Sequence, residues 1–312
     1  MNENLELYKK YRPTSFKQIV GQPEAVRTLV TMLTKNTFPH TLLISGSSGV
    51  GKTTIARILK DKLHCGDSDY HEINAASSRG IDTIREIQQV MHLAPISGHC
   101  RIWYLDEVHS LTKDAQNSAL KILEDSPDHV YFFLATTDPN RLLKTIVTRC
   151  THIRLSLLSQ KILISLAEWV LNQENITVDM DVIESVVEAS DGSARKCLVL
   201  LHQILGLPSK EEQLKAIHKA DAPKQAIQIA RILLNPRSKW ADLQEILVAI
   251  EDDPEGIRRL VLEYAKSVML KDNRASDRAY LILTCFEGDF FASGSAGLVR
   301  ACYEVYREKG IG

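Results

Sequence analysis

The sequence predicts an α/β domain with a parallel sheet over residues 1–154, followed by two all-α domains over 155–207 and 208–312. Two observations predict this division. Up to residue 153, short apolar runs of β type alternate with amphipathic helical runs, which is typical of a parallel sheet covered by helices on both faces. After Leu155 the β-type runs stop and helical periodicity continues.

The expected strands of the α/β domain are short apolar runs. They are TLLISG at 41–46, RIWYLDE at 101–107 and VYFFLATT at 130–137. The segments 53–63 and 114–125 carry apolar residues at helical spacing, so both are expected to be helices.

The helical half begins with runs at 160–175, 180–192 and 194–206, with glycine or asparagine near their ends. The segment GLPSKEEQ at 206–213 contains turn-forming residues, and it is the expected boundary between the two all-α domains. Further helices are expected at 222–235, 240–251, 254–271 and 276–291.

The composition is that of an ordinary globular protein, with 44% hydrophobic and 25% charged residues in a chain of 312. The apolar runs are too short to span a membrane, and the N-terminus lacks the apolar core of a signal peptide, so a cytoplasmic location is expected. The formal net charge is −1, so any binding to nucleic acid must use a local basic surface.

The cysteines predict no metal site, because no two of them have the CxxC spacing of a zinc ligand pair. We expect free thiols that pack as small apolar side chains. The cysteines are Cys65, Cys100, Cys150, Cys197, Cys285 and Cys302.

A phosphate-binding loop is predicted at GSSGVGKT, which matches the pattern GxxxxGK[ST] at every fixed position. Glycines let backbone N–H groups turn toward phosphate oxygens, and the helix that follows presents its positive end to the same anion. Lys52 is expected to bind the β- and γ-phosphates and Thr53 to bind Mg²⁺. The nucleotide-binding residues expected here are Gly46, Ser47, Ser48, Gly49, Val50, Gly51, Lys52, Thr53 and Thr54.

An acid pair, Asp106 and Glu107, ends the apolar run at 101–107. In a fold with a phosphate loop this strand lies beside the strand that precedes the loop. Asp106 is therefore expected to hold Mg²⁺, and Glu107 to orient and polarise the attacking water. Thr136 and Thr137 end the next strand, where a hydroxyl can contact the γ-phosphate or the water; a strand-end cap fits the sequence nearly as well.

With these motifs the chain resembles the clamp-loader branch of the AAA+ ATPases, which includes the bacterial DNA polymerase III gamma/tau motor subunit and the small subunits of replication factor C. The resemblance covers 8–203 in the family's order, through YKKYRPTSFKQIVGQ, LDEVHSL, LATTDPNRLLKTIVTRC and GSARKCLVLLHQ. It implies that 155–207 is a helical lid. Residues 208–312 match by length and helical character only, and would be the collar domain through which subunits form a ring.

The resemblance also implies roles for single residues. Thr137 would sense the γ-phosphate, Arg195 would reach that phosphate from the lid, and Arg149 would be an arginine finger. The residues expected to flank the adenine are Tyr11, Arg12, Pro13, Val20 and Gly21.

Arg149 is expected to act on a neighbouring subunit. It comes after the strand that ends at Thr137, on the far side of the domain from its own phosphate loop. An arginine finger supplied in trans speeds hydrolysis by about 10³–10⁵, so this residue predicts an oligomer. A surface arginine at a strand end is the alternative.

The segment NAASSRGIDTIREI resembles replication factor C, in which the matching helix start faces DNA. Contacts with the DNA backbone would be independent of base sequence and strongly dependent on salt. Ordinary solvated charges are the alternative for each residue. The candidates are Arg79, Gly80, Arg85, Lys113 and Lys121.

The sequence departs from the family's pattern in two places. The bacterial gamma subunit has a four-cysteine zinc module after its phosphate-loop helix, but HCGDSDYHEI retains only Cys65, so no zinc is expected. The family's Ser-Arg-Cys is Thr148-Arg149-Cys150 here, which keeps the hydroxyl. The long C-terminal extension of a tau subunit is also missing, and the length suits a loader of a phage or of a replication factor C-like system.

The expected function is that of a clamp-loader motor subunit that uses ATP and Mg²⁺. Several subunits, in a ring expected to be pentameric, would open a sliding clamp and place it on primer–template DNA at the nucleoid. DNA would stimulate the ATPase activity. The alternatives are another AAA+ motor such as a branch-migration helicase, a scaffold subunit that has lost ATP turnover, and a structural look-alike of the phosphate-loop fold.

Overall fold

The computed structural model describes residues 6–248, 250, 254–270, 276–290 and 293–308, without the side chains of 218–223. The chain divides into two compact units, Met1–His202 and Gln203–Gly312. The first unit contains the sheet and the helices that follow it as far as α9. The second unit is helical in its described residues.

The first unit is built on a five-stranded sheet in the order β2-β3-β4-β1-β5, with every neighbouring pair parallel. This confirms the predicted parallel α/β fold. The edge strands β2 and β5 were not predicted, because their sequences YHEIN and THIR are polar and only partly buried. The strands are β1 (Thr41–Ser45), β2 (Tyr70–Asn74), β3 (Arg101–Asp106), β4 (Val130–Thr136) and β5 (Thr151–Arg154).

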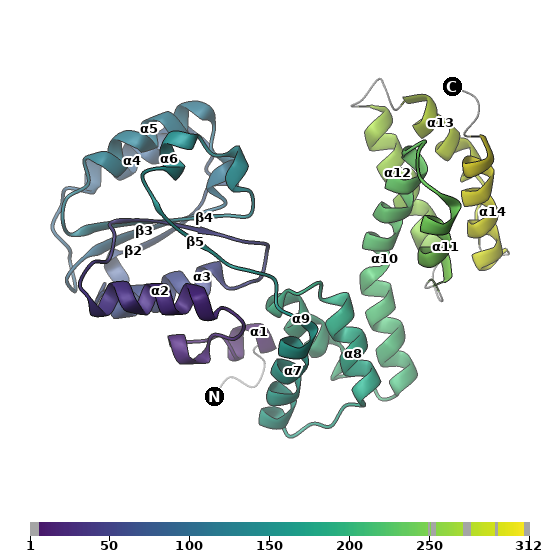
Figure 1. Ribbon diagram of the computed structural model, residues 1–312, viewed down its shortest axis with the longest axis horizontal. Coiled ribbons are helices and arrows are strands. Elements are labelled where there is room, and N and C mark those ends of the chain that lie inside the picture. The colour runs from purple at the N-terminus through teal and green to yellow at the C-terminus, as the bar shows by residue number, and fades with distance from the viewer. Residues whose placement is uncertain (1–5, 249, 251–253, 271–275, 291–292, 309–312) are drawn as a thin grey trace. The chain divides into compact units, whose positions relative to one another are not determined.

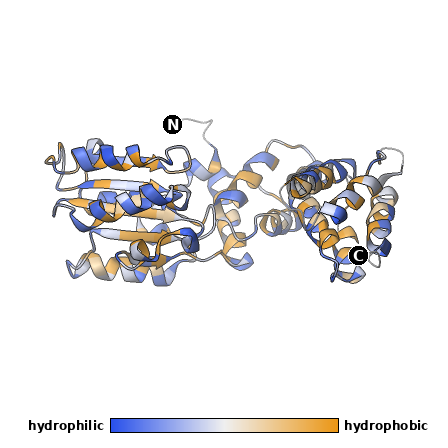
Figure 2. Ribbon diagram, turned by 90° about the horizontal axis from the view of Figure 1, so that it is seen from above, coloured by the Kyte–Doolittle hydropathy of each residue, from blue (hydrophilic) through white to orange (hydrophobic). Residues whose placement is uncertain are grey.

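Helices cover both faces of the sheet (Figure 1). One face packs against α2 (Pro23–Thr34) and α3 (Lys52–Lys62). The other packs against α4 (Ile81–Val90), α5 (Lys113–Glu124) and the short α6 (Lys144–Val147). Figure 2 shows the strands as largely hydrophobic and the helices of this unit as hydrophilic on their outer sides, as a buried parallel sheet requires.

The strand register brings the ends of the predicted motifs to one edge of the sheet. Ser45 at the end of β1 lies opposite Thr136 at the end of β4. On the next pair, Leu105 of β3 lies opposite Leu134 of β4. The expectation that the strand of the acid pair lies beside the strand before the loop is therefore wrong, because β4 lies between β3 and β1. The segments that follow β1, β3 and β4 therefore leave the sheet side by side, which is where ligands bind in parallel α/β folds.

A buried ion pair fastens the opposite end of the sheet. The side chains of Asp69 and Arg101 are 0% and 5% exposed, and Arg101 donates to Asp69 from Nε and Nη2 at 3.2 and 3.1 Å. Asp69 also accepts the N–H groups of Ile96 and Ser97, and Arg101 donates to Val90 O. Burial acts to raise the pKa of Asp69, but these hydrogen bonds outweigh it and lower the pKa. The loop after α4 is thus tied to the start of β3.

The first unit also contains α1 (Leu7–Lys10), the helices α7 (Gln160–Glu174) and α8 (Met180–Ala189), and α9 (Ala194–Ile204) except for its last two residues. The side chain of Gln22 exchanges two hydrogen bonds with the backbone of Ser156, which joins the start of α2 to the segment before α7. Short 3₁₀ turns lie at Phe16–Gln18, Asp67–Asp69, Val108–Ser110 and Pro139–Arg141.

The second unit is a bundle whose helices are α10 (Lys210–Leu234), α11 (Trp240–Val248), α12 (Pro254–Met269), α13 (Ser276–Cys285) and α14 (Gly294–Arg307). Helix α10 begins twelve residues before the helix expected at 222–235, inside the expected boundary segment 206–213, where Ser209 accepts the N–H of Glu212 at 3.3 Å. The ends of three expected helices, at Glu251, Lys271 and Phe291, lie outside the described residues.

Glu255 in the first turn of α12 joins this helix to the segment that follows α13. Its carboxylate accepts from Arg258 Nε and Nη2 at 2.7 Å each, and from the N–H of Phe290 at 2.9 Å. Arg258 reaches on to the carbonyl of Phe286. The hydrogen bonds from Arg258, helped by the Phe290 N–H and by Arg259, lower the pKa of Glu255 to about 2 against the opposing effect of burial.

Glu255→Gln should destabilise the second unit in a pH-dependent way. Because the folded-state pKa of about 2 lies below the unfolded value of about 4.3, the carboxylate's contribution is full above about pH 5 and is lost as the pH falls toward 2. The loss in unfolding free energy should be about 3 kcal/mol near pH 7 and should shrink at lower pH. Urea denaturation followed by Trp240 fluorescence, with Trp103 and Trp169 replaced by Phe, measures it.

Glu263→Gln is the matched control, because Glu263 pairs with Lys266 on the same helix but is 72% exposed. It should cost less than about 1 kcal/mol. An equal loss for Glu255→Gln at pH 7 and at pH 3 would contradict the assigned role of the carboxylate.

Candidate functional site

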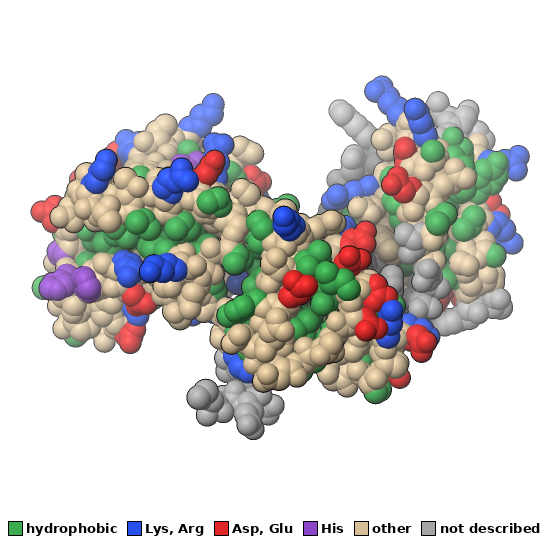
Figure 3. Space-filling model, turned by 60° about the horizontal axis from the view of Figure 1, so that its bottom comes forward, with side chains coloured by type: hydrophobic (Ala, Val, Ile, Leu, Met, Phe, Trp, Pro, Cys, Tyr) green, Lys and Arg blue, Asp and Glu red, His purple; other side chains and the backbone are tan. Residues whose placement is uncertain are grey.

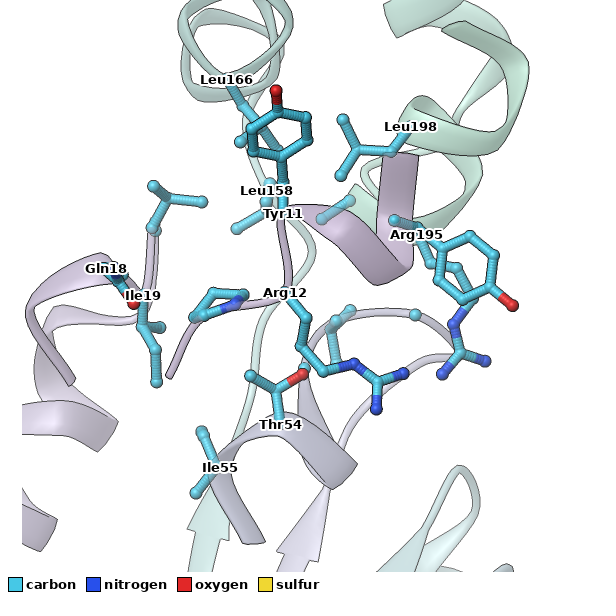
Figure 4. A pocket seen from close by; sticks show the side chains of 18 of the residues that line it. Tyr11, Arg12, Gln18, Ile19, Thr54, Ile55, Leu158, Leu166, Arg195 and Leu198 are labelled. Carbon is cyan, nitrogen blue, oxygen red and sulfur yellow. The ribbon is translucent and has the colours of Figure 1, made fainter. Parts of the chain in front are cut away.

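A cavity of about 980 Å³ opens in the first unit. Its walls come from the N-terminal segment 8–21, the loop and helix start at 48–55, the acids that end β3, and the helices α7 and α9. Figure 4 shows side chains from the N-terminal segment, α3, α7 and α9 arranged around this space. The predicted phosphate loop, acid pair and lid arginine thus border one cavity.

The phosphate loop runs directly into α3, which begins at Lys52. Gly49 has a φ of +77°, and a Cβ there would overlap Ser193 Oγ and lie 2.9 Å from Arg195 Cβ, so no side chain fits between the loop and α9. Lys52 is buried, and its Nζ donates to Gly46 O and Ser47 O at 2.8 and 3.0 Å. Burial lowers the pKa of Lys52 despite the nearby acids. Of the predicted loop residues, Gly46 and Ser47 do not line the cavity itself.

The acid pair lies at the end of β3, and both residues line the cavity. Burial raises the pKa of Asp106, whose Oδ1 accepts the N–H of Glu107 at 2.9 Å. Glu107 has a φ of +49°, which is uncommon for a residue with a side chain. The turn brings the Glu107 carboxylate to Thr137, which donates from Oγ1 at 3.0 Å and from its N–H at 3.3 Å. Thr137 does not line the cavity, but it contacts a residue that does.

His109 is a neighbour of the acid pair that the sequence did not single out. Its Nδ1 lies 3.2 Å from Glu107 Oε2 and 3.0 Å from the hydroxyl of the buried Thr136. His109 therefore links Glu107 to the end of β4. Its position two residues after Glu107 in LDEVHSL could have indicated a contact with the acid pair. A histidine after a strand end has many other roles, however, so the sequence alone did not identify it.

The other end of the cavity is apolar. The predicted adenine residues Tyr11, Pro13, Val20 and Gly21 line it, together with side chains that the lid contributes. Sequence reasoning missed the lid residues, because apolar residues at helical spacing are indistinguishable from ordinary core residues. They are Leu158, Ile162, Leu166 and Leu198.

The N-terminal segment is also tied to the lid by polar contacts. The Tyr11 hydroxyl donates to Glu174 at the end of α7 at 2.5 Å, and Lys10 pairs with the same carboxylate at 2.7 Å. Trp169 on α7 meets the Tyr11 ring edge-on, with centroids 5.4 Å apart. Helix α7 therefore holds the segment that covers this end of the cavity.

Two arginines enter the cavity from different segments, Arg12 from the N-terminal segment and Arg195 from α9 (Figure 4). The N–H of Arg195 donates to Gly49 O at 3.3 Å, and its guanidinium lies 5.9 Å from the centre of the Tyr8 ring. Burial, Arg57 and Arg195 lower the pKa of Arg12 in that order. Positive charges that are partly desolvated beside one another favour an anion between them.

Arg149 lies outside this cavity. Its guanidinium pairs with Glu124 on α5 and donates from Nη1 to Thr145 O at 2.9 Å. The side chain is 39% exposed. Arg149 is therefore held by α5 and by its own turn, and it does not line the cavity of its own chain.

The DNA-binding candidates are all exposed residues on the α4 and α5 side of the sheet. The N–H of Thr112, which caps α5, donates to Arg79 O at 3.2 Å, so Arg79 and Lys113 belong to adjoining segments. Arg85 pairs with Asp82 at 3.1 Å. Figure 3 brings the opposite side of the first unit forward, and there some of the Lys and Arg side chains lie next to Asp or Glu side chains. Gly80 precedes α4, and Lys121 lies in the last turn of α5.

Two kinds of feature are absent from the part of the chain that the structure describes. No group of three or more His, Cys, Asp and Glu side chains there could hold a metal ion. No described helix is both long and apolar enough to cross a membrane.

Comparison with known proteins identifies relatives in bacterial replication. The family model described as DNA polymerase III, delta subunit, matches residues 67–159. The gamma subunit of Buchnera aphidicola from Schizaphis graminum is 32% identical over 257 residues, which are 75% of this chain and 71% of that subunit. The tau subunit of Escherichia coli K12 is 34% identical over 220 residues, which are 64% of this chain and 34% of tau.

Solved structures agree on the fold. The RuvB Holliday junction branch migration motor of Thermotoga maritima matches 78% of this chain and 87% of that chain, with a TM-score of 0.58 and 19% identity. A likeness at this level of identity concerns the fold alone.

This chain matches different shares of the length of its relatives. The chain spans 64% of the gamma subunit of Buchnera aphidicola from Acyrthosiphon pisum, at 32% identity. The match to the second Buchnera gamma subunit includes more than two thirds of both chains. These matches confirm the resemblance that the motifs indicated, and the chain belongs to the DNA polymerase III gamma/tau family, in the clamp-loader branch of the AAA+ ATPases.

Proposed function

We propose that this chain is a motor subunit of a sliding-clamp loader, which binds and hydrolyses ATP to open a clamp and place it on primer–template DNA in the cytoplasm, at the nucleoid. One observation carries the proposal. A single cavity is bordered by the phosphate loop, the acid pair and the lid residue Arg195, in a chain whose relatives are named as gamma and tau subunits.

The residues at the polar end of the cavity suit a nucleoside triphosphate. The loop N–H groups and Lys52 would bind its phosphates, and Lys52 would exchange its present carbonyl partners for phosphate oxygens. Arg195 would reach the γ-phosphate from the lid. The apolar end, with Tyr11 and Val20 on one side and the lid leucines on the other, would enclose the adenine.

The oxygen donors Thr53 and Asp106 fit Mg²⁺, because a hydroxyl and a carboxylate that border the same cavity are the hard ligands this ion takes. When bound, Mg²⁺ neutralises charge on the β- and γ-phosphates. Glu107 would orient the attacking water and accept its proton. For this the carboxylate must give up its present contact with Thr137 or share it with the water.

Lys52→Ala and Glu107→Gln should separate binding from hydrolysis. Lys52→Ala removes the charge that meets the phosphates, so nucleotide affinity should fall at least tenfold. Glu107→Gln keeps the shape but removes the base, so binding should stay within about twofold while turnover falls by about 10²–10⁴. Fluorescence titration with a labelled ATP analogue and phosphate release measure the two effects. Full turnover in either variant would rule out the assignment.

Arg149 is proposed to act on the ATP of a neighbouring subunit. It does not line its own cavity, and its pair with Glu124 is partly exposed, so exchanging that carboxylate for a phosphate costs about 1 kcal/mol or less. The proposed assembly is a ring, pentameric by resemblance, in which one subunit supplies the phosphate loop and the next supplies the finger.

Arg149→Ala should leave nucleotide affinity nearly unchanged but reduce hydrolysis in the assembled ring by about 10³ or more. Arg141→Ala, which removes another exposed arginine from the same connection, is the control. Mixing Arg149→Ala subunits with Lys52→Ala subunits should restore part of the activity, because mixed interfaces combine an intact loop with an intact finger. Full activity of Arg149→Ala alone would place the finger elsewhere. An inactive Arg149→Ala variant that shows no recovery on mixing would contradict its action on a neighbouring subunit.

Arg79 and Lys113 are the best-placed of the proposed DNA-binding residues, since the Thr112–Arg79 backbone hydrogen bond joins their segments. Replacing both with Ala should weaken binding to every DNA sequence alike and lower the slope of log affinity against log salt by about 0.9 for each phosphate that is no longer neutralised. Lys35→Ala, on the opposite face of the sheet, is the control. An unchanged slope in the double variant would remove these residues from the interface.

A further inference from the structure

The buried tyrosine Tyr104 lies beside the nucleotide site without touching the cavity. It stands two residues before Asp106 on β3, so both side chains point to the same face of the sheet. Its side chain is 1% exposed and packs under α3, in a cluster with Ile55, Ile58 and Leu59. A phenol in such surroundings needs a partner for its hydroxyl, because burying an unpaired hydroxyl costs free energy.

The partner of Tyr104 is Thr53. The two hydroxyl oxygens are 3.0 Å apart, and Thr53 is in the first turn of α3. Burial raises the pKa of Tyr104 far above its usual range, so it stays a neutral phenol that can donate and accept. Thr53 lines the cavity and at the same time contacts Tyr104 on the buried face of the sheet.

The hydrogen-bonding capacity of Thr53 decides which of the two hydroxyl groups donates the hydrogen bond when a cation is bound. Its hydroxyl has one hydrogen and two lone pairs. With a cation bound to one lone pair of Thr53, the hydroxyl hydrogen would point away from the cavity toward an acceptor. The oxygen of Tyr104 is that acceptor, at 3.0 Å.

We propose that Tyr104 is a positioning residue for the magnesium site: its hydroxyl fixes the orientation of Thr53, and so raises the affinity of the nucleotide site for the ion. The proposal rests on the proposed ATPase function. It explains why a tyrosine stands where phenylalanine or leucine would fill the same buried space without a hydroxyl to satisfy.

Tyr104→Phe removes the hydroxyl and keeps the ring. In the full chain, affinity for a fluorescent ADP analogue in EDTA should be unchanged, while the Mg²⁺ concentration needed for half-maximal tightening should rise about tenfold, the usual cost of losing a group that orients a metal ligand. Binding of Mn²⁺ to the nucleotide complex, followed by electron paramagnetic resonance, should weaken by a similar factor. Tyr131→Phe, on the neighbouring strand β4, is the control and should change neither.

A double-mutant cycle separates positioning from packing. If Tyr104 acts largely through Thr53, Tyr104→Phe should have much less effect on the Mg²⁺ requirement in a Thr53→Ala background than in the wild type. Equal effects in both backgrounds, or a Mg²⁺ requirement of Tyr104→Phe equal to that of the wild type, would overturn the proposal. A wild type whose nucleotide binding ignores Mg²⁺ would overturn the proposed ATPase as well, so the two failures are distinguishable.

Discussion

The parallel register of β1, β3 and β4 is the constraint on which the nucleotide site depends. Since Ser45 pairs with Thr136 and Leu105 with Leu134, three segments distant in sequence leave the sheet at one edge. The phosphate loop, the acid pair and the contact between Glu107 and Thr137 all follow from this alignment. If one of these strands shifted by one residue, its side chains would turn to the opposite face of the sheet, and its end would no longer meet the others in this arrangement.

Two contacts connect this part of the sheet to its neighbours. On the sheet side, the hydrogen bond between Thr53 and Tyr104 joins the first turn of α3 to the strand that carries Asp106. On the lid side, the approach of Arg195 to Gly49 joins the loop to α9. The phosphate loop and the helix that follows it are therefore in direct contact with both the sheet and α9.

The sequence predicted the parts of the site that are encoded locally. GSSGVGKT and the acids of RIWYLDE carry their chemistry in adjacent residues, so a pattern and a strand end were enough to identify them. Strands β2 and β5 were missed, because edge strands are polar and do not alternate clearly. Tyr104, His109 and the lid leucines were missed for a different reason: their roles come from residues that only the fold brings near, and a tyrosine in an apolar strand looks like core. The pairing of Arg149 with Glu124 could not be predicted either, as 25 residues separate them.

The proposed clamp-loader function is tested most directly by the rate of ATP hydrolysis of the assembled loader with a sliding clamp and primed DNA, added separately and together. A clamp-loader motor predicts that the two together accelerate hydrolysis well beyond the sum of their separate effects, because both are substrates of one reaction. Stimulation by branched DNA without any effect of the clamp would instead indicate a branch-migration motor, and would contradict the central claim.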